Sequence, residues 1–240
     1  MVSSIAARIK MARHPVAVLR SSVRPENALQ LKEGVWACAI GLLNAASKGD
    51  TAVFSEATTA CNGGRVGLGF CKFQLGFIEH FLSTGQEGGR PGERYKETPE
   101  LAAEYVTNMP SVEPKEYLVL KPLEQLQPEE QPDHIVFLVN ADQLSALVTL
   151  ANFDLPGRGH VELRFGAACA QTLLFPMANS EQAPDICTIG LTDPSGRKYI
   201  EKDLLAFSIP YHRYLAMEEK AENSFLTTDT WAQIAKRISE

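Results

Sequence analysis

The stretch Pro132-Asp-His-Ile-Val-Phe-Leu-Val139, followed by Asn140 and Asp142, decides the fold class of this chain. Residues 134–139 are almost all apolar, as expected of a strand that is buried on both faces of a sheet. Asn140 and Asp142 are helix-capping residue types, and apolar residues recur on one side of the helical sequence that follows. A strand, a cap and a helix in this order indicate a βα unit, and therefore an α/β protein.

Similar signals flank this unit on both sides. Residues 14–20 and 161–165 have the pattern of strands, and each is followed by an apolar helical stretch, at about 28–48 and 166–174. We therefore predict an α/β fold with a mixed sheet flanked by helices, built as a single domain of two similar halves. The predicted boundaries are residues 1–240 for the domain, 14–97 and 115–215 for the halves, and 212–240 for a C-terminal helical tail.

Composition excludes several classes of protein. Of the 240 residues, 45% are hydrophobic and 22% are charged, which is typical of a globular chain. Lys and Arg number 23 against 29 Asp and Glu, so the basic excess of a nucleic-acid-binding protein is absent. No apolar run approaches the roughly 18 residues of a membrane-spanning helix.

The chain has five widely spaced cysteines and no export signal. We therefore expect reduced thiols in the cytoplasm. Association into a homo-oligomer stays open.

The cysteines suggest an internal repeat. Ala37-Cys38-Ala39 lies on one predicted helix and is followed, twenty-three positions later, by Cys61, which opens a glycine-rich stretch. Ala168-Cys169-Ala170 lies on a second predicted helix and is followed, eighteen positions later, by Cys187, with Gly196-Arg197 beyond it. If the halves are repeats, Cys38, Cys61, Cys169 and Cys187 should converge in a shared crevice.

The same motifs carry a resemblance to a known family. Ala37-Cys38-Ala39, Cys61-Asn-Gly-Gly-Arg-Val-Gly-Leu-Gly-Phe70, Pro132 to Val139, Ala168-Cys169-Ala170, Cys187 and Ser208-Ile-Pro-Tyr211 occur in the order found in DUF169, the uncharacterised ArCR-like proteins of archaea and bacteria. The resemblance extends from Val16 to about Glu218. It implies one α/β domain built from two similar halves and draws attention to the four cysteines. It implies no particular activity.

The resemblance is incomplete at two places. The compact Cys-x-Gly-x-Arg motif of the family is stretched here to Cys187-Thr-Ile-Gly190 and then Gly196-Arg197, and Cys71 has no counterpart.

The glycine-rich stretch is the first candidate site. Four glycines between Cys61 and Gly69, ahead of a helix, would let backbone N–H groups converge on a carboxylate or phosphate, and Arg65 would add donors. Our first hypothesis is therefore binding of a small anionic ligand or cofactor in a cleft between the Cys61–Gly69 loop and the Cys187 turn. The candidate ligand-binding residues are Cys61, Gly63, Gly64, Arg65, Gly67, Cys187 and Arg197.

Two alternatives use the cysteines differently. The first is an enzyme or redox protein that reacts through its thiols, or that holds zinc or an iron–sulfur cluster with Cys38, Cys61, Cys169 and Cys187. No Cys-x-x-Cys pair supports the metal version. The second alternative is a structural or interaction protein whose cysteines are small core residues, since alanines flank Cys38 and Cys169 on apolar helices.

Overall fold

The chain folds into two compact units. One, here called the sheet unit, comprises residues 1–70 and 112–240, and the other, the inserted unit, comprises residues 71–111. The computed structural model describes residues 2–86, 89–157 and 159–238.

The predicted halves, 14–97 and 115–215, can be compared with this division. Residues 71–97, assigned from the sequence to the first half, belong to the inserted unit. Residues 87–88 of that half and residues 239–240 of the predicted tail lie outside the described residues.

The inserted unit contains two short helices. They are α4 (Ile78–Leu82) and α5 (Pro99–Thr107). Thr98 caps α5 by accepting a hydrogen bond from the N–H of Leu101, and Pro99 occupies the first helical position, where its missing N–H leaves no bond unmade.

The described residues of the sheet unit form one eight-stranded sheet in the order β2-β3-β4-β1-β5-β8-β7-β6. The strands are β1 (Val16–Ser21), β2 (Leu29–Gln30), β3 (Ala52–Phe54), β4 (Tyr117–Pro122), β5 (His134–Val139), β6 (Val161–Leu163), β7 (Cys187–Gly190) and β8 (Leu205–Pro210). The helices are α1 (Ser4–Arg8), α2 (Ala39–Ala46), α3 (Asn62–Gly67), α6 (Ala141–Leu150), α7 (Phe175–Gln182), α8 (Pro194–Arg197), α9 (Tyr211–Lys220) and α10 (Asp229–Ile238). Short 3₁₀ turns span Leu123–Gln125, Ala221–Asn223 and Phe225–Thr227.

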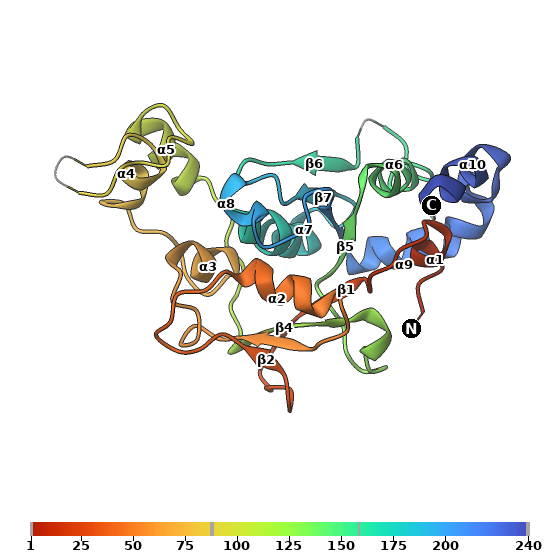
Figure 1. Cartoon of the computed structure of the whole chain (residues 1–240), viewed down its shortest axis with the longest axis horizontal. Coiled ribbons are helices and arrows are strands. Elements are labelled where there is room, and N and C mark those ends of the chain that lie inside the picture. Colours follow the sequence, from red (N-terminus) through yellow and green to blue (C-terminus); the bar gives the residue numbers. More distant parts are fainter. Residues whose placement is uncertain (1, 87–88, 158, 239–240) are drawn as a thin grey trace. The chain divides into compact units, whose positions relative to one another are not determined.

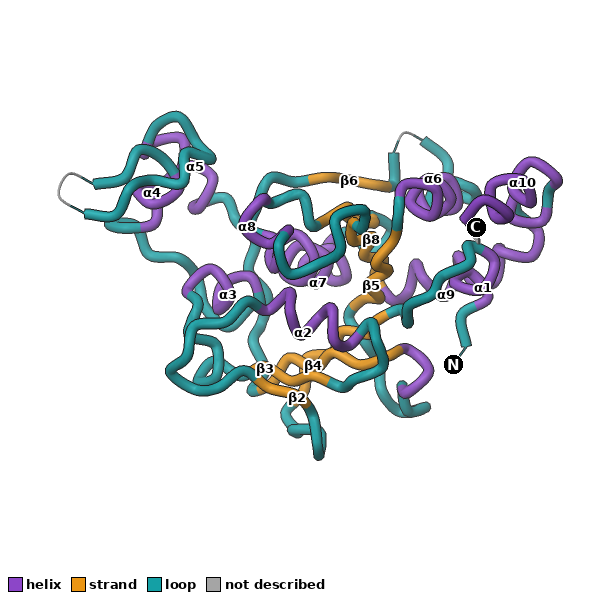
Figure 2. Tube along the Cα trace, in the orientation of Figure 1, coloured by secondary structure: helices purple, strands orange, loops and turns teal. Residues whose placement is uncertain are grey.

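The strand order is the same in the two halves of the sheet, which meet at the central pair β1 and β5. On one side of that pair the order is β2-β3-β4-β1, and from the opposite edge inward it is β6-β7-β8-β5. In each half the first two strands are parallel and the remaining pairs are antiparallel. β1 and β5 join the halves, with Ala17 opposite Ile135. The predicted fold class, two similar halves in a mixed sheet flanked by helices, is confirmed (Figures 1 and 2).

One face of the sheet carries the large apolar core. Alternate residues of β5 and β8 point into it: Ile135, Phe137, Val139, Phe207 and Ile209. Four helices complete this core, namely α1, α6, α9 and α10, through Ile5, Leu147, Tyr214 and Trp231. No helix in the described part of the chain is long and apolar enough to cross a membrane.

The opposite face is covered by the helical segment that runs from Ala168 into α7. A π-helical turn spans Ala170–Leu174 within it. Pro176 has no N–H, so it cannot donate to the carbonyl of Thr172 four residues earlier. That carbonyl instead accepts hydrogen bonds from His134 Nε2 (3.0 Å) and Ser208 Oγ (3.2 Å). The proline thus accounts for the wide turn, and the turn bonds this segment to the two central strands β5 and β8.

The helix predicted over residues 28–48 is shorter in the structure. Residues 29–30 form β2, and α2 begins only at Ala39. Gly34, which lies between them, has a φ of +70°, a left-handed conformation that ends helical geometry and that glycine adopts without strain.

Candidate functional site

Three cysteines of the sheet unit lie at the starts of helical segments on the face opposite the large core. Cys38 is the N-cap of α2, Cys61 is the N-cap of α3, and Cys169 immediately precedes the π-helical turn. An N-cap residue has extended backbone and points its side chain at the first free N–H groups of the helix. Cys61 does so, since its Sγ accepts the N–H of Gly64 at 3.4 Å.

The repeat of the sheet also relates these positions to one another. Cys38 corresponds to Cys169, because each starts the helix that connects the two parallel strands of its half. The counterpart of Cys61 is Asp193, the N-cap of α8, which follows Cys169 by twenty-four positions as Cys61 follows Cys38 by twenty-three. Cys61-Asn-Gly-Gly-Arg65 therefore corresponds to Asp193-Pro-Ser-Gly-Arg197. The sequence-based pairing of Cys61 with Cys187 was wrong.

Helix α3 packs closely against the start of the Cys169 segment. The thiol of Cys169 donates to the carbonyl of Gly63 at 3.3 Å. A Cβ atom at Gly67 would lie only 2.4 Å from Cys169 Sγ and 2.8 Å from the backbone nitrogen of Ala170. The glycine at position 67 therefore permits a close approach between two segments more than a hundred residues apart in the chain.

The three thiols share one electrostatic environment. Burial is the main cause that raises the pKa of Cys38, and the neighbouring Cys61 and Asp193 raise it further. Burial also raises the pKa of Cys169 strongly, followed by the effects of Cys61 and Cys38. Cys38 and Cys61 are partly exposed whereas Cys169 is buried. Three thiols and one carboxylate thus gather around the packed starts of four helical segments.

Cys187 lies elsewhere. It opens β7 with its side chain in the large core, and burial raises its pKa to about 12. The next residue, Thr188, contacts Asn179 of α7 on the opposite face, as the alternation of a strand requires. Cys187 and Cys61 therefore do not line one site, and the predicted convergence of four thiols is wrong for Cys187.

The predicted metal set is accordingly not assembled. Within residues 2–86, 89–157 and 159–238, no three His, Cys, Asp or Glu side chains are placed to hold a metal ion. Asp193, which occupies the fourth position of the cluster, already accepts hydrogen bonds from Ser195 and from the N–H of Ala168. Metal binding by Cys38, Cys61 and Cys169 stays a prediction.

The glycine-rich stretch is a helix rather than a loop. Residues 62–67 form α3, and Cys71 lies outside any helix. Gly67 and Gly69 meet close packing, because a Cβ at Gly69 would lie 2.7 Å from Val112. The glycines at these two positions are therefore explained by packing.

Both arginines of the predicted ligand site have protein partners. Arg65 forms an ion pair with Glu56. Arg197 donates to the backbone carbonyls of Leu191, Lys202 and Leu204, so its guanidinium fixes the turn between α8 and β8. The ligand-binding role of Arg65, Arg197, Gly63 and Gly64 stays a prediction.

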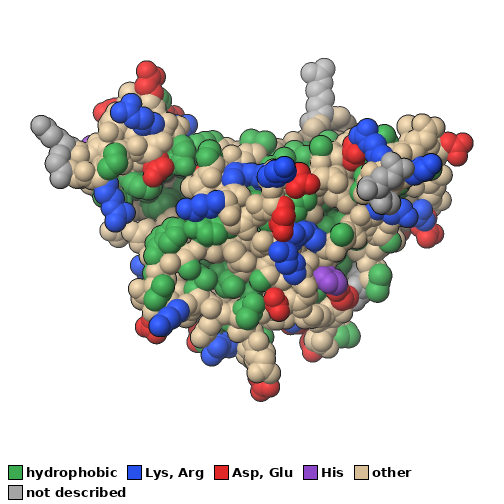
Figure 3. All heavy atoms as spheres, viewed as in Figure 1, with side chains coloured by type: hydrophobic (Ala, Val, Ile, Leu, Met, Phe, Trp, Pro, Cys, Tyr) green, Lys and Arg blue, Asp and Glu red, His purple; other side chains and the backbone are tan. Residues whose placement is uncertain are grey.

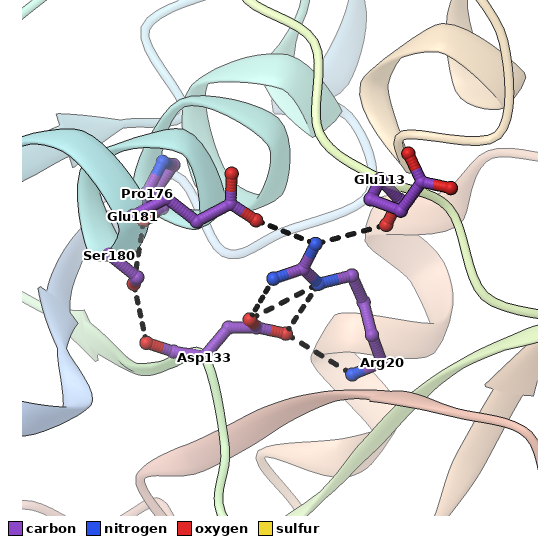
Figure 4. A network of polar contacts seen from close by, with 6 residues as sticks. All are labelled: Arg20, Glu113, Asp133, Pro176, Ser180 and Glu181. Carbon is purple, nitrogen blue, oxygen red and sulfur yellow. Dashed lines mark hydrogen bonds and ion pairs between the residues drawn. The ribbon is translucent and has the colours of Figure 1, made fainter.

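A charged network that the sequence did not indicate anchors α7 to the centre of the sheet (Figure 4). Arg20, on β1, pairs with Asp133 at 2.6 Å and with Glu181 of α7 at 2.8 Å. It also donates to the carbonyl of Glu113, and Ser180 Oγ lies 2.5 Å from the carbonyl of Asp133. These contacts hold the helix that follows Cys169, and the bonds to Asp133 and then to Glu181 raise the pKa of Arg20.

Charges of both signs are interspersed on the face of the sheet unit seen in Figure 3. Ion pairs of the sheet unit include Arg164 with Glu162, and Arg13 and Lys48 with Glu201. The surface in this view therefore carries no continuous basic stripe.

The close contact between α8 and the Cys169 segment gives a testable prediction. A Cβ at Gly196 would lie 2.3 Å from the Cβ of Ala168, and every other neighbour is at least 3.8 Å away. We expect Gly196→Ala to lower the free energy of unfolding by about 2 kcal/mol. Ala168→Gly should restore most of that loss in the double variant, because it removes the clashing atom. Urea unfolding followed by circular dichroism measures both, and a double variant as unstable as Gly196→Ala would contradict the assigned contact.

Comparison with known proteins adds a family. The model of DUF169, described as uncharacterised ArCR, matches residues 4–220. No curated protein and no solved structure matches the chain. The family match confirms the resemblance carried by the cysteine motifs, and it spans both halves of the sheet.

Proposed function

We propose that this chain, which belongs to the DUF169 family, is a thiol–disulfide redox protein in which Cys61 attacks and Cys38 resolves. One observation carries the proposal: three reduced thiols from distant parts of the sequence gather at the starts of helical segments that are packed together. Cysteines that serve only as core residues, like Cys187, need no such grouping.

Cys61 is the best candidate for the attacking thiol. It is partly exposed, and its sulfur accepts a backbone N–H from Gly64. A backbone N–H that donates to the sulfur favours the thiolate, and the thiolate is the nucleophile in disulfide exchange. Cys169 is a poorer candidate because it is buried, its thiol already donates to Gly63, and its pKa is raised.

The proposed reaction balances without a bound cofactor. The Cys61 thiolate attacks one sulfur of a substrate disulfide, the substrate S–S bond breaks, and the departing sulfur leaves as a thiolate that takes up a proton. Cys38, deprotonated, then attacks the Cys61 sulfur of the mixed disulfide and releases the second substrate thiolate. The substrate gains two electrons and the protein loses two, with a Cys38–Cys61 disulfide as its oxidised form. A dithiol reverses both steps.

The competing hypothesis of anion binding has less support. Its two arginines have protein partners, Cys187 belongs to the large core, and the packing at Gly67 and Gly69 explains these glycines without a ligand.

Oxidised glutathione tests the proposal directly. All proteins carry Cys71→Ser, so that the reacting thiols are those of the sheet unit. We expect the otherwise wild-type protein to lose two electrons and to yield a Cys38–Cys61 linked peptide in mass spectrometry. Cys38→Ser should accumulate glutathione on Cys61, and Cys61→Ser should give neither product.

Cys187→Ala is the matched control for the same experiment. It removes a thiol from the large core, and we expect it to react as wild type does. Glutathione adducts spread evenly over the cysteines, or no intramolecular disulfide in the wild type, would contradict the proposed function. Stoichiometric metal in the anaerobically purified protein would favour the metal alternative instead.

A further inference from the structure

Of the three clustered thiols, Cys169 takes no part in the proposed reaction, yet it makes a directional polar contact. Only 8% of the residue is exposed, and its Sγ lies 3.3 Å from the carbonyl oxygen of Gly63. A carbonyl oxygen can only accept a hydrogen bond, so the thiol of Cys169 is the donor. This bond joins the Cys169 segment to the first turn of α3, the helix that Cys61 caps.

The acceptor of that bond belongs to the same peptide group that contacts Cys61. The carbonyl of Gly63 and the N–H of Gly64 are the two ends of one planar peptide unit. Its N–H end donates to Cys61 Sγ at 3.4 Å, and its carbonyl end accepts from Cys169. Two hydrogen bonds in series therefore connect the sulfur of Cys169 to the sulfur of Cys61.

Hydrogen bonds arranged in series strengthen one another. A donor at the carbonyl polarises the peptide group and makes its N–H a better donor, and the effect is larger away from water. Gly64 is buried, so this peptide lies in such surroundings. The strengthened N–H bond ends at the Cys61 sulfur, which carries the negative charge when Cys61 is the attacking thiolate.

This arrangement requires that Cys169 keep its proton. Burial, followed by the effect of the neighbouring Cys61, raises the pKa of Cys169, so its thiol remains a donor while Cys61 ionises. The close approach of the two segments depends on Gly67, where a Cβ atom would lie 2.4 Å from Cys169 Sγ. The glycine thus leaves room for the sulfur beside α3.

We propose that Cys169 is a positioning residue for Cys61: through the Gly63–Gly64 peptide it orients and strengthens the N–H bond to the attacking sulfur. The inference rests on the proposed function and deepens it, because it gives the third thiol a role in the same site. Cys169 forms no covalent bond in this role and stays a thiol throughout the reaction.

The pH dependence of alkylation tests this role without requiring any redox activity. The rate constant of iodoacetamide at Cys61 is measured between about pH 6 and 10 by peptide mass spectrometry. Cys169→Ala removes the donor, so the midpoint for Cys61 should rise by about 0.3–0.5 pH unit, a two- to threefold slower reaction at pH 7. Cys169→Ser keeps a donor, so its midpoint should stay close to that of the wild type.

Cys187→Ala is the matched control, since it removes a buried thiol from the large core and should leave the Cys61 midpoint unchanged. Circular dichroism establishes which variants fold. A folded Cys169→Ala protein with an unshifted midpoint overturns the proposal. Equal shifts in Cys169→Ala and Cys169→Ser overturn it as well, because the volume of the sulfur and not its proton would then matter. If neither variant folds, Cys169 is a structural residue only and the proposal fails.

The outcome for Cys169 is separable from the outcome for the redox function. A raised Cys61 midpoint in Cys169→Ala, in a protein that does not exchange with oxidised glutathione, would reject the redox function and leave the effect of Cys169 on Cys61 established. Normal exchange with an unshifted midpoint would reject the role of Cys169 alone.

Discussion

Replacing Gly67 with alanine is expected to lower the free energy of unfolding by about 3 kcal/mol. The new Cβ would lie 2.4 Å from Cys169 Sγ and 2.8 Å from the backbone nitrogen of Ala170. The thiol could rotate away, but the backbone nitrogen belongs to the buried π-helical turn and can move only if the helix moves. Urea unfolding followed by circular dichroism measures the loss.

The same helix supplies a matched control. A Cβ at Gly63 would meet only Cys61 Sγ, at 4.0 Å, so alanine there adds helix propensity without a clash. Gly63→Ala should raise the free energy of unfolding by about 0.5–1 kcal/mol. Cys169→Ala in the Gly67→Ala background should restore part of the loss, since it removes the nearest atom but not the Ala170 nitrogen. Equal effects of alanine at positions 63 and 67 would contradict the close packing of α3.

Acid is expected to remove roughly 3 kcal/mol of stability through His134 alone. Burial lowers the pKa of this histidine from 6.5 to about 4 in the folded protein. The unfolded chain therefore takes up the proton first as the pH falls. The contribution is fully present above pH 6.5, declines between pH 6.5 and 4, and is lost below pH 4.

The variant that tests this is His134→Gln, whose amide can still donate to the carbonyl of Thr172 but does not titrate. Its free energy of unfolding should fall less steeply than that of the wild type between pH 6.5 and 4, whatever its value at pH 7. His212→Gln is the control, since His212 is exposed. Parallel pH profiles for the wild type and His134→Gln would show that His134 does not contribute to acid unfolding.

The parts of the fold that the sequence predicted are those in which local pattern and burial agree. The apolar run 134–139 is β5, and Asn140 caps α6 in a reciprocal pair with Gln143. The apolar residues and the capping residue type are visible in the sequence itself. Cys38 and Cys169 were likewise predicted as counterparts from their shared alanine neighbours, and the topology supports that pairing.

The parts that were missed depend on contacts between distant residues. Three glycines in six residues argue against a helix at 62–67, and α3 forms because packing against the Cys169 segment outweighs that propensity. Cys187 was placed in the site because it is a cysteine, but its position in β7 turns it to the other face. Asp193 was overlooked because its role is defined by a backbone position, an N-cap, that different side chains can occupy. The shared Gly-Arg after Cys61 and Asp193 was the available signal.

The duplicated strand order has an evolutionary consequence. Two copies of a half-length ancestor, meeting along the strand that became β1 in one copy and β5 in the other, would form a symmetric dimer with this topology. In such a dimer a single gene encodes both helix caps, so every mutation appears twice. Fusion into one polypeptide removes that constraint, and the cap can then become a thiol in one copy and a carboxylate in the other. The asymmetry between Cys61 and Asp193 is a specialisation that a symmetric homodimer encoded by one gene cannot acquire.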